Sequence, residues 1–512
     1  MDSIGKLYNF ILCTRLEKWF KPDREQAGAQ QGRGCMEHIV TLRLLMDYAV
    51  YKKKKLYVLY VDFSKAYDRV PRHALLETLR RLGCGAVMLY AIYVMYSSTQ
   101  LIFGTAIITA AIGVRQGSPT SCLLFTLYVN GLIRDLKLMC EPDGFLSWLH
   151  CLMLMDDTII FASNRDAFFK KVKVLVRFCK TTGMVINDDK TKFMVVNGAP
   201  EDMEPIHESG IIIKNCDSYT YLGSLFLQNG RVKSAIAAQC KAKGGQLLKY
   251  RSFVTKNSDL PFWAKKKVLD SALLTSVFYA CESWLCKSLD AAQTLHMTGI
   301  KSLLGVRTTT PNDPCLIEVG YTSASGMIRG IQKKFFHSMF TKREGMEDDP
   351  FMKAWDIARQ ANTPCARYIK ELLDEDDPPK REFSGIQDRV RSSTKTKAST
   401  YTEMNPRLEV HKVYTVSSQP IPEHYRLAFT QIRLGAHSLA IETGRWSRIP
   451  REQRLCECGE VQTENHILAR CEKTEDIRSS SSNIECFSIP NLFENNDIKA
   501  MCYLCYKCLH AY

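Results

Sequence analysis

An α+β fold is predicted from the sequence, and three observations lead to this prediction. Strand-forming apolar runs alternate with helical patterns through residues 1–230. The pattern then becomes helical and basic over residues 231–373. Closely spaced cysteines and a histidine follow in residues 456–471, which is typical of a small structural metal site.

The first elements follow from local composition. Residues 1–60 are expected to be mainly helical, because apolar residues recur at helical spacing up to a lysine-rich end. The aromatic and β-branched run LYVLYVDF predicts a strand. Two helices follow, HALLETLRRLG, which ends at Gly83, and AVMLYAIYVMYSS. Short strands around Gly104 predict a hairpin, and SCLLFTLYVNGLIRDLKLM predicts a long apolar helix.

The remaining elements extend to the C-terminus. The stretch SWLHCLMLMDDTIIFAS predicts two strands joined by a tight turn at its paired aspartates. A helix ending near Gly183 should come next, and VINDDKTKFMVVNG and SYTYLGSLF complete the strands. Residues 374–407 are charged and contain proline, which predicts a linker. A small region over 408–475 and a tail with a short helix over 476–512 complete the chain.

Charge and composition narrow the class of protein. The net charge is +15, from 69 basic and 54 acidic residues, which favours a polyanionic partner such as nucleic acid. A lysine-rich solvated surface is the alternative. No apolar run approaches the ~18 residues of a membrane span. The 20 cysteines are scattered through apolar runs, which indicates reduced thiols in an intracellular protein.

Three aspartates lie against apolar, strand-forming residues. Asp62 follows LYVLYV, and the adjacent pair Asp156–Asp157 lies inside CLMLMDDTIIFA. Buried carboxylates are costly unless they are paired or bound to a metal. Two magnesium ions held by such a cluster would suit metal-assisted nucleotidyl transfer. An ordinary hairpin turn and an exposed strand residue are the alternative, since aspartate is common in turns.

Several motifs occur in a recognisable order. YVDFSKAYDRV, GVRQGSPTSCLLFTLYVNGLI, LMLMDDTIIFAS, GMVINDDKTKFMVVN and YTYLGSLF together resemble the motifs of reverse transcriptases, with LINE-type retrotransposons, which lack long terminal repeats, as the closest likeness. The upstream EQAGAQQGRGCMEHIVTLRLL is similar to the finger motif of that family. The resemblance implies a right-hand polymerase, with fingers and an antiparallel palm sheet over residues 1–230 and a helical thumb and connector over 231–373.

The resemblance assigns roles to individual residues. Asp62, Asp156 and Asp157 match the catalytic aspartates that bind two magnesium ions, with manganese as an alternative. Lys190 lies where the family carries a lysine that protonates the pyrophosphate leaving group; a solvated lysine is the alternative. The substrate-binding positions are Phe63, through its carbonyl, Tyr67, which would exclude a ribose 2′-hydroxyl, and Gln116 and Gly117 beside the template and nucleotide. Tyr221, Leu222 and Gly223 match the primer grip.

The function implied by the resemblance is RNA-directed DNA polymerase activity. Its partners would be an RNA template, a DNA primer and deoxynucleoside triphosphates, without a membrane, and the implied site of action is the nucleus. Leu154–Met155 replaces the usual aromatic–alanine pair, and AGAQQGRG lacks an expected aromatic and arginine. Because Met1 begins late relative to the family, an N-terminally truncated element is expected, and an inactive nucleic-acid-binding remnant is the alternative function.

A separate cluster near the C-terminus has the form C-x-C-x7-H-x4-C. Its ligand set would be Cys456, Cys458, His466 and Cys471, which suits a closed structural zinc site, and four unconnected residues are the alternative. The preceding segment resembles that of the zinc knuckle in the same elements, with Arg433, Arg445, Arg448 and Trp446 as candidates for nucleic-acid contact.

Two further sets of residues leave alternatives open. Cys502, Cys505 and Cys508, with His510, could suggest a metal site, but their spacing favours one face of a helix. Lysines of the thumb region could follow the backbone of an RNA–DNA duplex, and a solvated helix face is the alternative. These lysines are Lys241, Lys243, Lys249, Lys265, Lys266 and Lys267.

Overall fold

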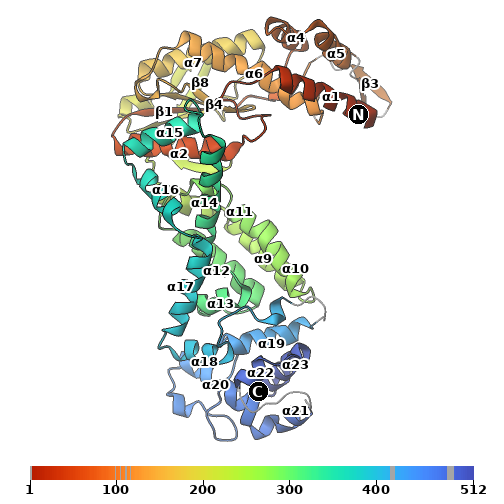
Figure 1. Cartoon of the computed structure of the whole chain (residues 1–512), viewed down its shortest axis with the longest axis vertical. Helices are drawn as coiled ribbons and strands as arrows, with labels where there is room; N and C mark the ends of the chain where they lie inside the picture. Colours follow the sequence, from red (N-terminus) through yellow and green to blue (C-terminus); the bar gives the residue numbers. More distant parts are fainter. Residues whose placement is uncertain are drawn as a thin grey trace. The chain divides into compact units, whose positions relative to one another are not determined.

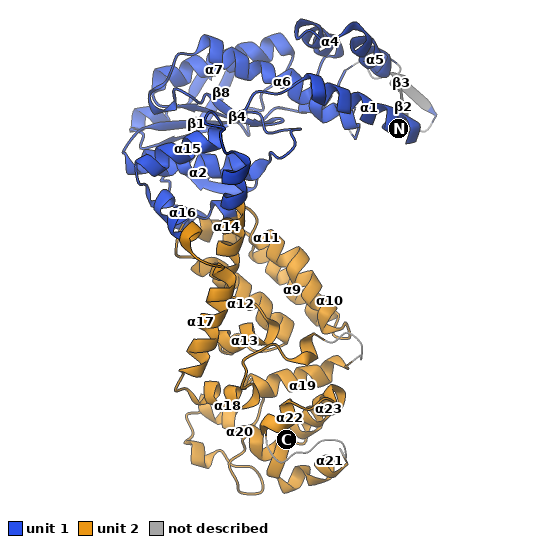
Figure 2. Cartoon of the chain, in the orientation of Figure 1, with its two compact units in different colours: residues 1–235, 282–285, 336–371 blue, residues 236–281, 286–335, 372–512 orange. Residues whose placement is uncertain are grey.

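The computed structural model describes residues 3–97, 100–103, 105–109, 112–115, 117–415, 421–480 and 489–512. The chain divides into two units (Figure 2). Unit 1 contains residues 1–235, 282–285 and 336–371, and unit 2 contains 236–281, 286–335 and 372–512. Each unit joins segments that are distant in sequence, whereas each predicted domain is one continuous range. The predicted domain boundaries stay predictions.

A six-stranded sheet forms the centre of unit 1. Its strand order is β4-β5-β1-β6-β8-β7. The pairings are antiparallel as predicted, except that β6 pairs parallel with β8. All six residues of β1 are buried, which explains the run LYVLYV. The strands are β1 Leu56–Val61, β4 Cys151–Leu154, β5 Asp157–Ala162, β6 Lys192–Val196, β7 Ile206–Glu208 and β8 Ile211–Asn215.

Helices cover both faces of this sheet (Figure 1). On one face, α7 packs on β5 and on α6, and Tyr57 of β1 contacts Phe168 of α7 at 5.1 Å between ring centroids. On the other face, α2 contacts β6 and α15 packs on α2. The helices of unit 1 are α1 Ser3–Trp19, α2 Cys35–Tyr51, α3 Ala66–Arg69, α4 Arg72–Arg81, α5 Ala86–Ser97, α6 Pro119–Met139, α7 Arg165–Thr182 and α15 Pro350–Gln360. Three more helices contain residues of both units: α8 Val232–Ala242, α14 Ala324–Lys342 and α16 Pro364–Asp374.

Two hairpins accompany the sheet. β2 Gln100–Phe103 pairs with β3 Ala106–Thr109, which confirms the predicted hairpin, although Gly104 itself lies outside the described residues. β9 Ser218–Tyr221 pairs with β10 Ser224–Leu227. The predicted helix end at Gly183 is also confirmed, since this glycine has a φ of 72° directly after α7.

Unit 2 consists of helices over the residues that the structure describes. The π-helical turns are η3 Leu269–Leu274 and η7 His466–Arg470. The helices are α9 Gly244–Lys256, α10 Phe262–Val268, α11 Thr275–Val277, α12 Asp290–Leu304, α13 Asn312–Val319, α17 Pro378–Arg391, α18 Thr396–Met404, α19 Glu423–Arg433, α20 Ala440–Trp446, α21 Glu475–Ser479, α22 Ile489–Phe493 and α23 Ile498–His510. The short 3-10 turns of the two units are η1 Gly144–Leu146, η2 Pro200–Met203, η4 Cys281–Ser283, η5 Lys412–Tyr414, η6 Arg451–Gln453 and η8 Glu472–Thr474.

The predicted linker over residues 374–407 is wrong as a description of local structure. The segment contains α17 and α18, which bury Ile386, Val390 and Tyr401 while their charged residues face solvent. By contrast, the predicted helical face near the C-terminus is confirmed, because Cys502, Cys505 and Cys508 of α23 are all buried. Among the described residues, no helix is both long and apolar enough to cross a membrane.

A buried ionic cluster joins distant segments within unit 1. The Arg33 guanidinium lies 2.6 Å from the Asp349 carboxylate and 3.3 Å from that of Glu37. Glu37 also accepts from Arg343 at 2.6 Å, and Arg343 lies 3.4 Å from Asp349. Two positive and two negative charges are therefore removed from water together, and loss of any one of them would leave a buried charge without compensation.

We expect Glu37→Gln to lower the free energy of unfolding by about 3–5 kcal/mol, because it leaves two buried guanidinium groups with one carboxylate. Urea unfolding measures the change. The control is Glu77→Gln, which removes an exposed carboxylate paired with Arg80 and Arg81 and should leave the urea midpoint almost unchanged. Equal midpoints for the two variants would contradict the assignment of Glu37 to a buried cluster.

Candidate functional site

Strand pairing brings the three predicted aspartates to one end of the sheet. β1 pairs antiparallel with β5, with Val61 opposite Thr158, so Asp62 and Asp157 are the next residues across the same two strands. Asp156 lies in the tight turn between β4 and β5, where Leu154 pairs with Asp157. The sequence therefore placed these carboxylates on the elements that converge.

Burial and neighbouring negative charge raise the pKa values of Asp156 and Asp157. Burial raises the pKa of Asp157 to about 6, with the charges of Asp156 and Asp62 adding to the effect. Burial also raises the pKa of Asp156, and the charge of Asp62 raises it further. The cluster therefore carries more negative charge than its protein surroundings neutralise, and its oxygen-only donor set fits a divalent ion such as magnesium.

Residues 186–191 fix the backbone around Asp62. The Asn187 amide donates to the Asp62 carbonyl at 2.8 Å, and the Asp62 amide donates to the Thr191 hydroxyl at 3.1 Å. Phe63 forms an isolated bridge with Ile186, and its side chain is buried. Lys190 is exposed, and its Nζ lies 3.8 Å from an Asp62 carboxylate oxygen. Sequence reasoning missed Thr191, although its place beside Lys190 was a usable signal.

Tyr67 lies beside the aspartate turn. Its ring stacks on Phe125 of α6 at 4.4 Å between centroids, and its hydroxyl donates to the Met155 sulfur at 3.1 Å. Burial raises the pKa of the Tyr67 hydroxyl. The methionine that departs from the usual family residue is thus the partner of this tyrosine.

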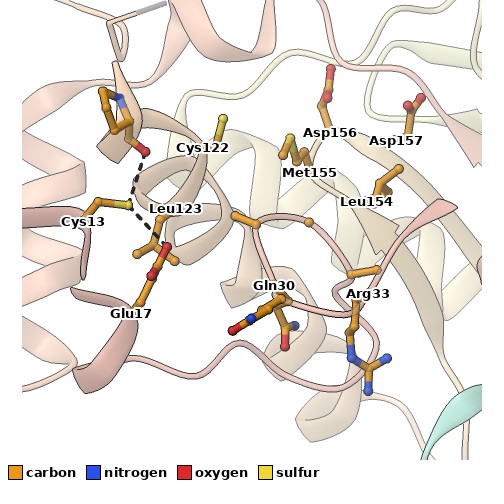
Figure 3. Close-up of a pocket in the computed structure, with 15 residues that line it drawn as sticks. Cys13, Glu17, Gln30, Arg33, Cys122, Leu123, Leu154, Met155, Asp156 and Asp157 are labelled. Atoms are coloured by element: carbon orange, nitrogen blue, oxygen red, sulfur yellow. Dashed lines mark hydrogen bonds between the residues drawn. The ribbon is translucent and has the colours of Figure 1, made fainter. Parts of the chain in front are cut away.

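A pocket of about 690 Å³ opens beside the paired aspartates. Figure 3 shows Asp156 and Asp157 on one side of it, away from Cys13 and Glu17. The lining comes from α1, residues 27–33, the start of α6 and the turn 154–157. Among the described lining residues, the charged side chains are three carboxylates, Glu17, Asp156 and Asp157, and one guanidinium, Arg33, which is already paired with Asp349.

The two other predicted nucleotide-side residues precede α6. Gln116 lies outside the described residues. Gly117 has a φ of 78°, a left-handed conformation that suits glycine in the turn before α6 begins at Pro119.

The predicted primer-grip residues form the turn between β9 and β10. Leu222 and Gly223 have φ values of 47° and 79°, and Tyr221 is buried with its ring 6.2 Å from that of Tyr60. Tyr219, which the sequence did not single out, stacks on Tyr60 at 4.0 Å. Burial raises the pKa of Tyr219 to about 12, and the negative charges of Asp62 and Asp157 add to the effect. This hairpin therefore lies close to the carboxylates.

The predicted zinc ligands converge in unit 2. The ligand atoms of Cys456, Cys458, His466 and Cys471 all lie within 4.8 Å of one another, and among the described residues no other group of three or more such side chains is so tight. The three aspartates of unit 1 are therefore spaced more widely than this cluster. The sulfur of Cys471 lies 3.7 Å from that of Cys456 and 4.0 Å from that of Cys458. Tetrahedral zinc with 2.3 Å bonds would place sulfurs about 3.8 Å apart.

The surroundings of Cys456 favour its thiolate form, whereas those of Cys458 raise the pKa of that thiol. Burial would raise the pKa of Cys456, but hydrogen bonds from the Cys458 backbone, Tyr512 and His466 outweigh it and lower the pKa to about 6. The Tyr512 hydroxyl also lies 2.7 Å from the Cys471 sulfur. His466 Nδ1 lies 2.9 Å from a Glu460 carboxylate oxygen, although the two atoms are not aligned for a hydrogen bond.

Two basic residues predicted to contact nucleic acid are buried instead. Arg433 is 2% exposed and its guanidinium lies 2.6 Å from Glu318, so its predicted role at phosphate is wrong. Lys265 is 2% exposed and pairs with Glu423 at 2.9 Å, so it cannot follow a duplex backbone. In both cases the acidic partner is more than a hundred residues away in sequence.

Trp446 is 58% exposed, and the Arg307 guanidinium lies 4.0 Å from the centroid of its ring.

Comparison with known proteins identifies the N-terminal region. Residues 1–226 match the reverse transcriptase (RNA-dependent DNA polymerase) family. The chain is 25% identical over 243 residues to the Pol polyprotein of the type-2 retrotransposable element R2DM of Drosophila melanogaster, covering 44% of this chain and 23% of that protein. It is also 25% identical over 251 residues to the R2 Pol polyprotein of Nasonia vitripennis, covering 45% of this chain and 24% of that one. This chain therefore spans about a quarter of the length of these relatives.

Solved structures give a weaker likeness. Telomerase from Candida albicans in complex with a fragment of telomeric RNA has a TM-score of 0.32 and 13% identity, with 75% of this chain and 56% of that chain covered. Apo telomerase from Candida tropicalis has a TM-score of 0.33 and 15% identity, with 73% and 58% covered. The family match and the retrotransposon relatives point the same way: residues 1–226 match the reverse transcriptase family, and the chain is similar to Pol polyproteins of R2 retrotransposable elements.

Proposed function

We propose that this chain is an RNA-directed DNA polymerase that extends a DNA primer on an RNA template. The observation that carries the proposal is the convergence of Asp62, Asp156 and Asp157 at one end of the sheet, in a region that matches the reverse transcriptase family, with Asp156 and Asp157 lining a pocket of about 690 Å³. The proposed division is fingers and palm over residues 1–230, thumb and connector over 231–373 and a zinc-binding region over 408–475. Nuclear action on chromosomal DNA is part of the same proposal.

In the proposed reaction, the primer 3′-hydroxyl gives up its proton to water, its oxygen forms a bond to the α-phosphorus of the nucleotide, and the bond from that phosphorus to the pyrophosphate oxygen breaks. Asp62, Asp156 and Asp157 would hold two divalent ions, which supply charge neutralisation at the reacting phosphate when bound. Lys190 is exposed near Asp62 and can carry a proton to the departing pyrophosphate. Tyr221, Leu222 and Gly223 would support the primer end, and Gly117 and Phe63 would border the nucleotide through their backbone.

Primer extension tests the proposal. The parent chain and Asp156→Asn/Asp157→Asn are each given magnesium, four deoxynucleotides and a DNA primer on either an RNA or a DNA template. Extension on RNA by the parent, lost in the double variant, is the expected result. A folded parent that binds the primed RNA without extending it would instead favour the alternative, a non-catalytic nucleic-acid-binding remnant.

Tyr67 is proposed to exclude ribonucleotides. Because its ring is held by Phe125 and Met155, Tyr67→Ala should open space at the sugar and reduce discrimination against ribonucleotides by about 10–100-fold. Tyr67→Phe removes only the hydroxyl and should keep the discrimination. Single-nucleotide incorporation with matched deoxy- and ribonucleotides measures both, and unchanged selectivity in Tyr67→Ala would contradict the role.

The charge of the pocket gives a gain-of-function prediction. The only cation among its described lining residues, Arg33, is paired with Asp349, whereas a nucleotide brings a highly charged triphosphate. Gln30→Arg adds a guanidinium to this lining and should lower the KM for deoxynucleotides by about tenfold, the size of one charge-assisted contact. Gln30→Met is the control without added charge. Steady-state kinetics decide, and equal KM values for the two variants would contradict the prediction.

We further propose that the cysteine–histidine cluster holds a structural zinc ion and that its region binds nucleic acid. The converging ligands support the first part. Exposed Trp446, with Arg445 and Arg448 beside it in sequence, supports the second, because aromatic rings stack on bases and guanidinium groups contact phosphate. Weaker binding of single-stranded RNA by Trp446→Ala, measured by fluorescence anisotropy, would bear this out, and unchanged affinity would oppose it.

A further inference from the structure

The side chain of Gln26 lies against the turn that carries the paired aspartates. It is fully buried, with an exposed fraction of 0%. Its Oε1 atom accepts hydrogen bonds from the Met155 amide at 3.0 Å and the Gly28 amide at 2.8 Å. Both partners are backbone donors, so the side-chain oxygen must face them. Gln26 thus reaches the backbone of the residue that directly precedes Asp156.

The main chain around Gln26 is joined to the same strand. Residues 25–27 run alongside β4 as a parallel bridge, in which the Ala27 amide donates to the Met153 carbonyl and the Met153 amide donates to the Glu25 carbonyl, both at 2.8 Å. This pairing places residues 25–27 in register with the end of β4. The Gln26 side chain continues the contact into the turn itself.

The turn adopts a backbone conformation that needs support. Met155 has a φ of 60°, in the left-handed region that side-chain-bearing residues rarely occupy. Gly28 allows the close approach, because a Cβ there would lie 2.7 Å from the Met155 nitrogen and 2.6 Å from its Cγ. Tyr67 holds the Met155 side chain through its sulfur, and Figure 3 shows Met155 beside Asp156 at the pocket.

The side-chain amide nitrogen of Gln26, Nε2, has no hydrogen-bond partner among the described residues. Leaving a buried donor unpaired is unfavourable, so the structure tolerates a cost to place an uncharged acceptor here. Glutamate would offer the same two bonds without the unpaired donor, but it would bring another negative charge toward Asp156 and Asp157.

We infer that Gln26 is a positioning residue for the carboxylate site. Its side-chain oxygen holds the Met155 backbone in the left-handed conformation, and this sets the direction in which Asp156 leaves the turn. The inference rests on the proposed function only for the identity of the reaction that is affected. The geometry of the site does not depend on that function, because metal binding reports it independently of catalysis.

The test combines Gln26→Met, which keeps the length and removes the acceptor, with Met155→Gly, which adopts a positive φ without strain. Gln26→Met should lower kcat at least about tenfold and weaken Mn²⁺ affinity about fivefold, with the KM for deoxynucleotides within about threefold. In the Met155→Gly background, Gln26→Met should reduce kcat and Mn²⁺ affinity by a factor at least about threefold smaller, because glycine adopts this conformation without the support of Gln26. Gln26→Glu keeps the acceptor and should retain more kcat than Gln26→Met.

Mn²⁺ binding to zinc-loaded protein, measured by electron paramagnetic resonance, separates this inference from the polymerase proposal. A parent that binds Mn²⁺ but extends no primer would defeat the proposed function, while the Mn²⁺ series would still decide the role of Gln26. The control is Gln360→Met, the same substitution at an exposed glutamine of α15. Equal losses in both backgrounds, including failure of both Gln26→Met proteins to fold, or no loss at all, would overturn the inference. Folding restored only by Met155→Gly would support it.

Discussion

Asp156→Asn/Asp157→Asn is expected to reduce primer extension by at least about 10³-fold, because the two carboxylates are proposed to hold the ions that neutralise the reacting phosphate. The same change should raise the melting temperature of the metal-free protein. Burial raises the pKa values of both residues, and the charge of Asp62 on both and of Asp156 on Asp157 raises them further, so their ionised forms destabilise the folded state. Loss of activity with a gain of stability is typical of functional sites.

The gain in stability should depend on pH. The pKa of Asp157 is about 6 in the folded chain against an ordinary value of 3.8, so between these values the folded state binds more protons than the unfolded state. The free energy of unfolding contributed by this group therefore falls as pH rises through that window. The variant should exceed the parent in melting temperature more at pH 8 than at pH 4.

Differential scanning calorimetry at the two pH values, in the presence of a chelator, measures this effect. The control is Asp166→Asn, which removes an exposed carboxylate in the first turn of α7 and should leave extension intact without raising the melting temperature. A double variant that is less stable than the parent at pH 8 would show that the carboxylates are satisfied by the protein alone.

Loss of the zinc ligands should have the second large effect. Structural zinc sites contribute roughly 10–16 kcal/mol of apparent binding free energy in small domains, so their loss unfolds the surrounding segment. Cys471→Ser should abolish retention of one zinc ion per chain and remove hydrogen-exchange protection from residues 455–475, which surround the cluster. Mass spectrometry of the intact protein and of its exchanged peptides gives both quantities.

The control for this experiment is Cys502→Ser. Cys502 is also a buried thiol, but it lies on α23 and outside the cluster. The zinc content of Cys502→Ser should therefore match that of the parent. If Cys471→Ser retained full zinc, or if the parent purified with zinc held none, the four side chains would have to be regarded as neighbours without a metal.

The sequence could predict the carboxylate site because its signals are local. An apolar strand that ends in Asp62 and a strand–turn–strand around Asp156–Asp157 each specify their own element, and antiparallel pairing brings them together. The Cys456 cluster was predictable for the same reason, since its four ligands lie within 16 residues of sequence from 456 to 471. The roles of Lys190, Tyr67 and the β9–β10 turn stay predictions.

The errors arise where a partner is distant in sequence. Arg433 and Lys265 look like solvent-exposed cations until Glu318 and Glu423 are seen to bury them. Residues 374–407 look like a linker because only a few positions, among them Ile386 and Tyr401, face a core that other segments supply. Gln26 was missed because no local pattern shows that its segment runs alongside β4.

The location of divalent ions tests the central claim most directly. A structure of the chain with an RNA template, a DNA primer that ends in a dideoxynucleotide, an incoming deoxynucleotide and Mn²⁺ would show the ions by anomalous scattering. We expect manganese peaks in contact with the carboxylates of Asp62, Asp156 and Asp157, between them and the triphosphate. Bound nucleic acid and nucleotide with no manganese at these three residues would contradict the assignment of this site to polymerisation.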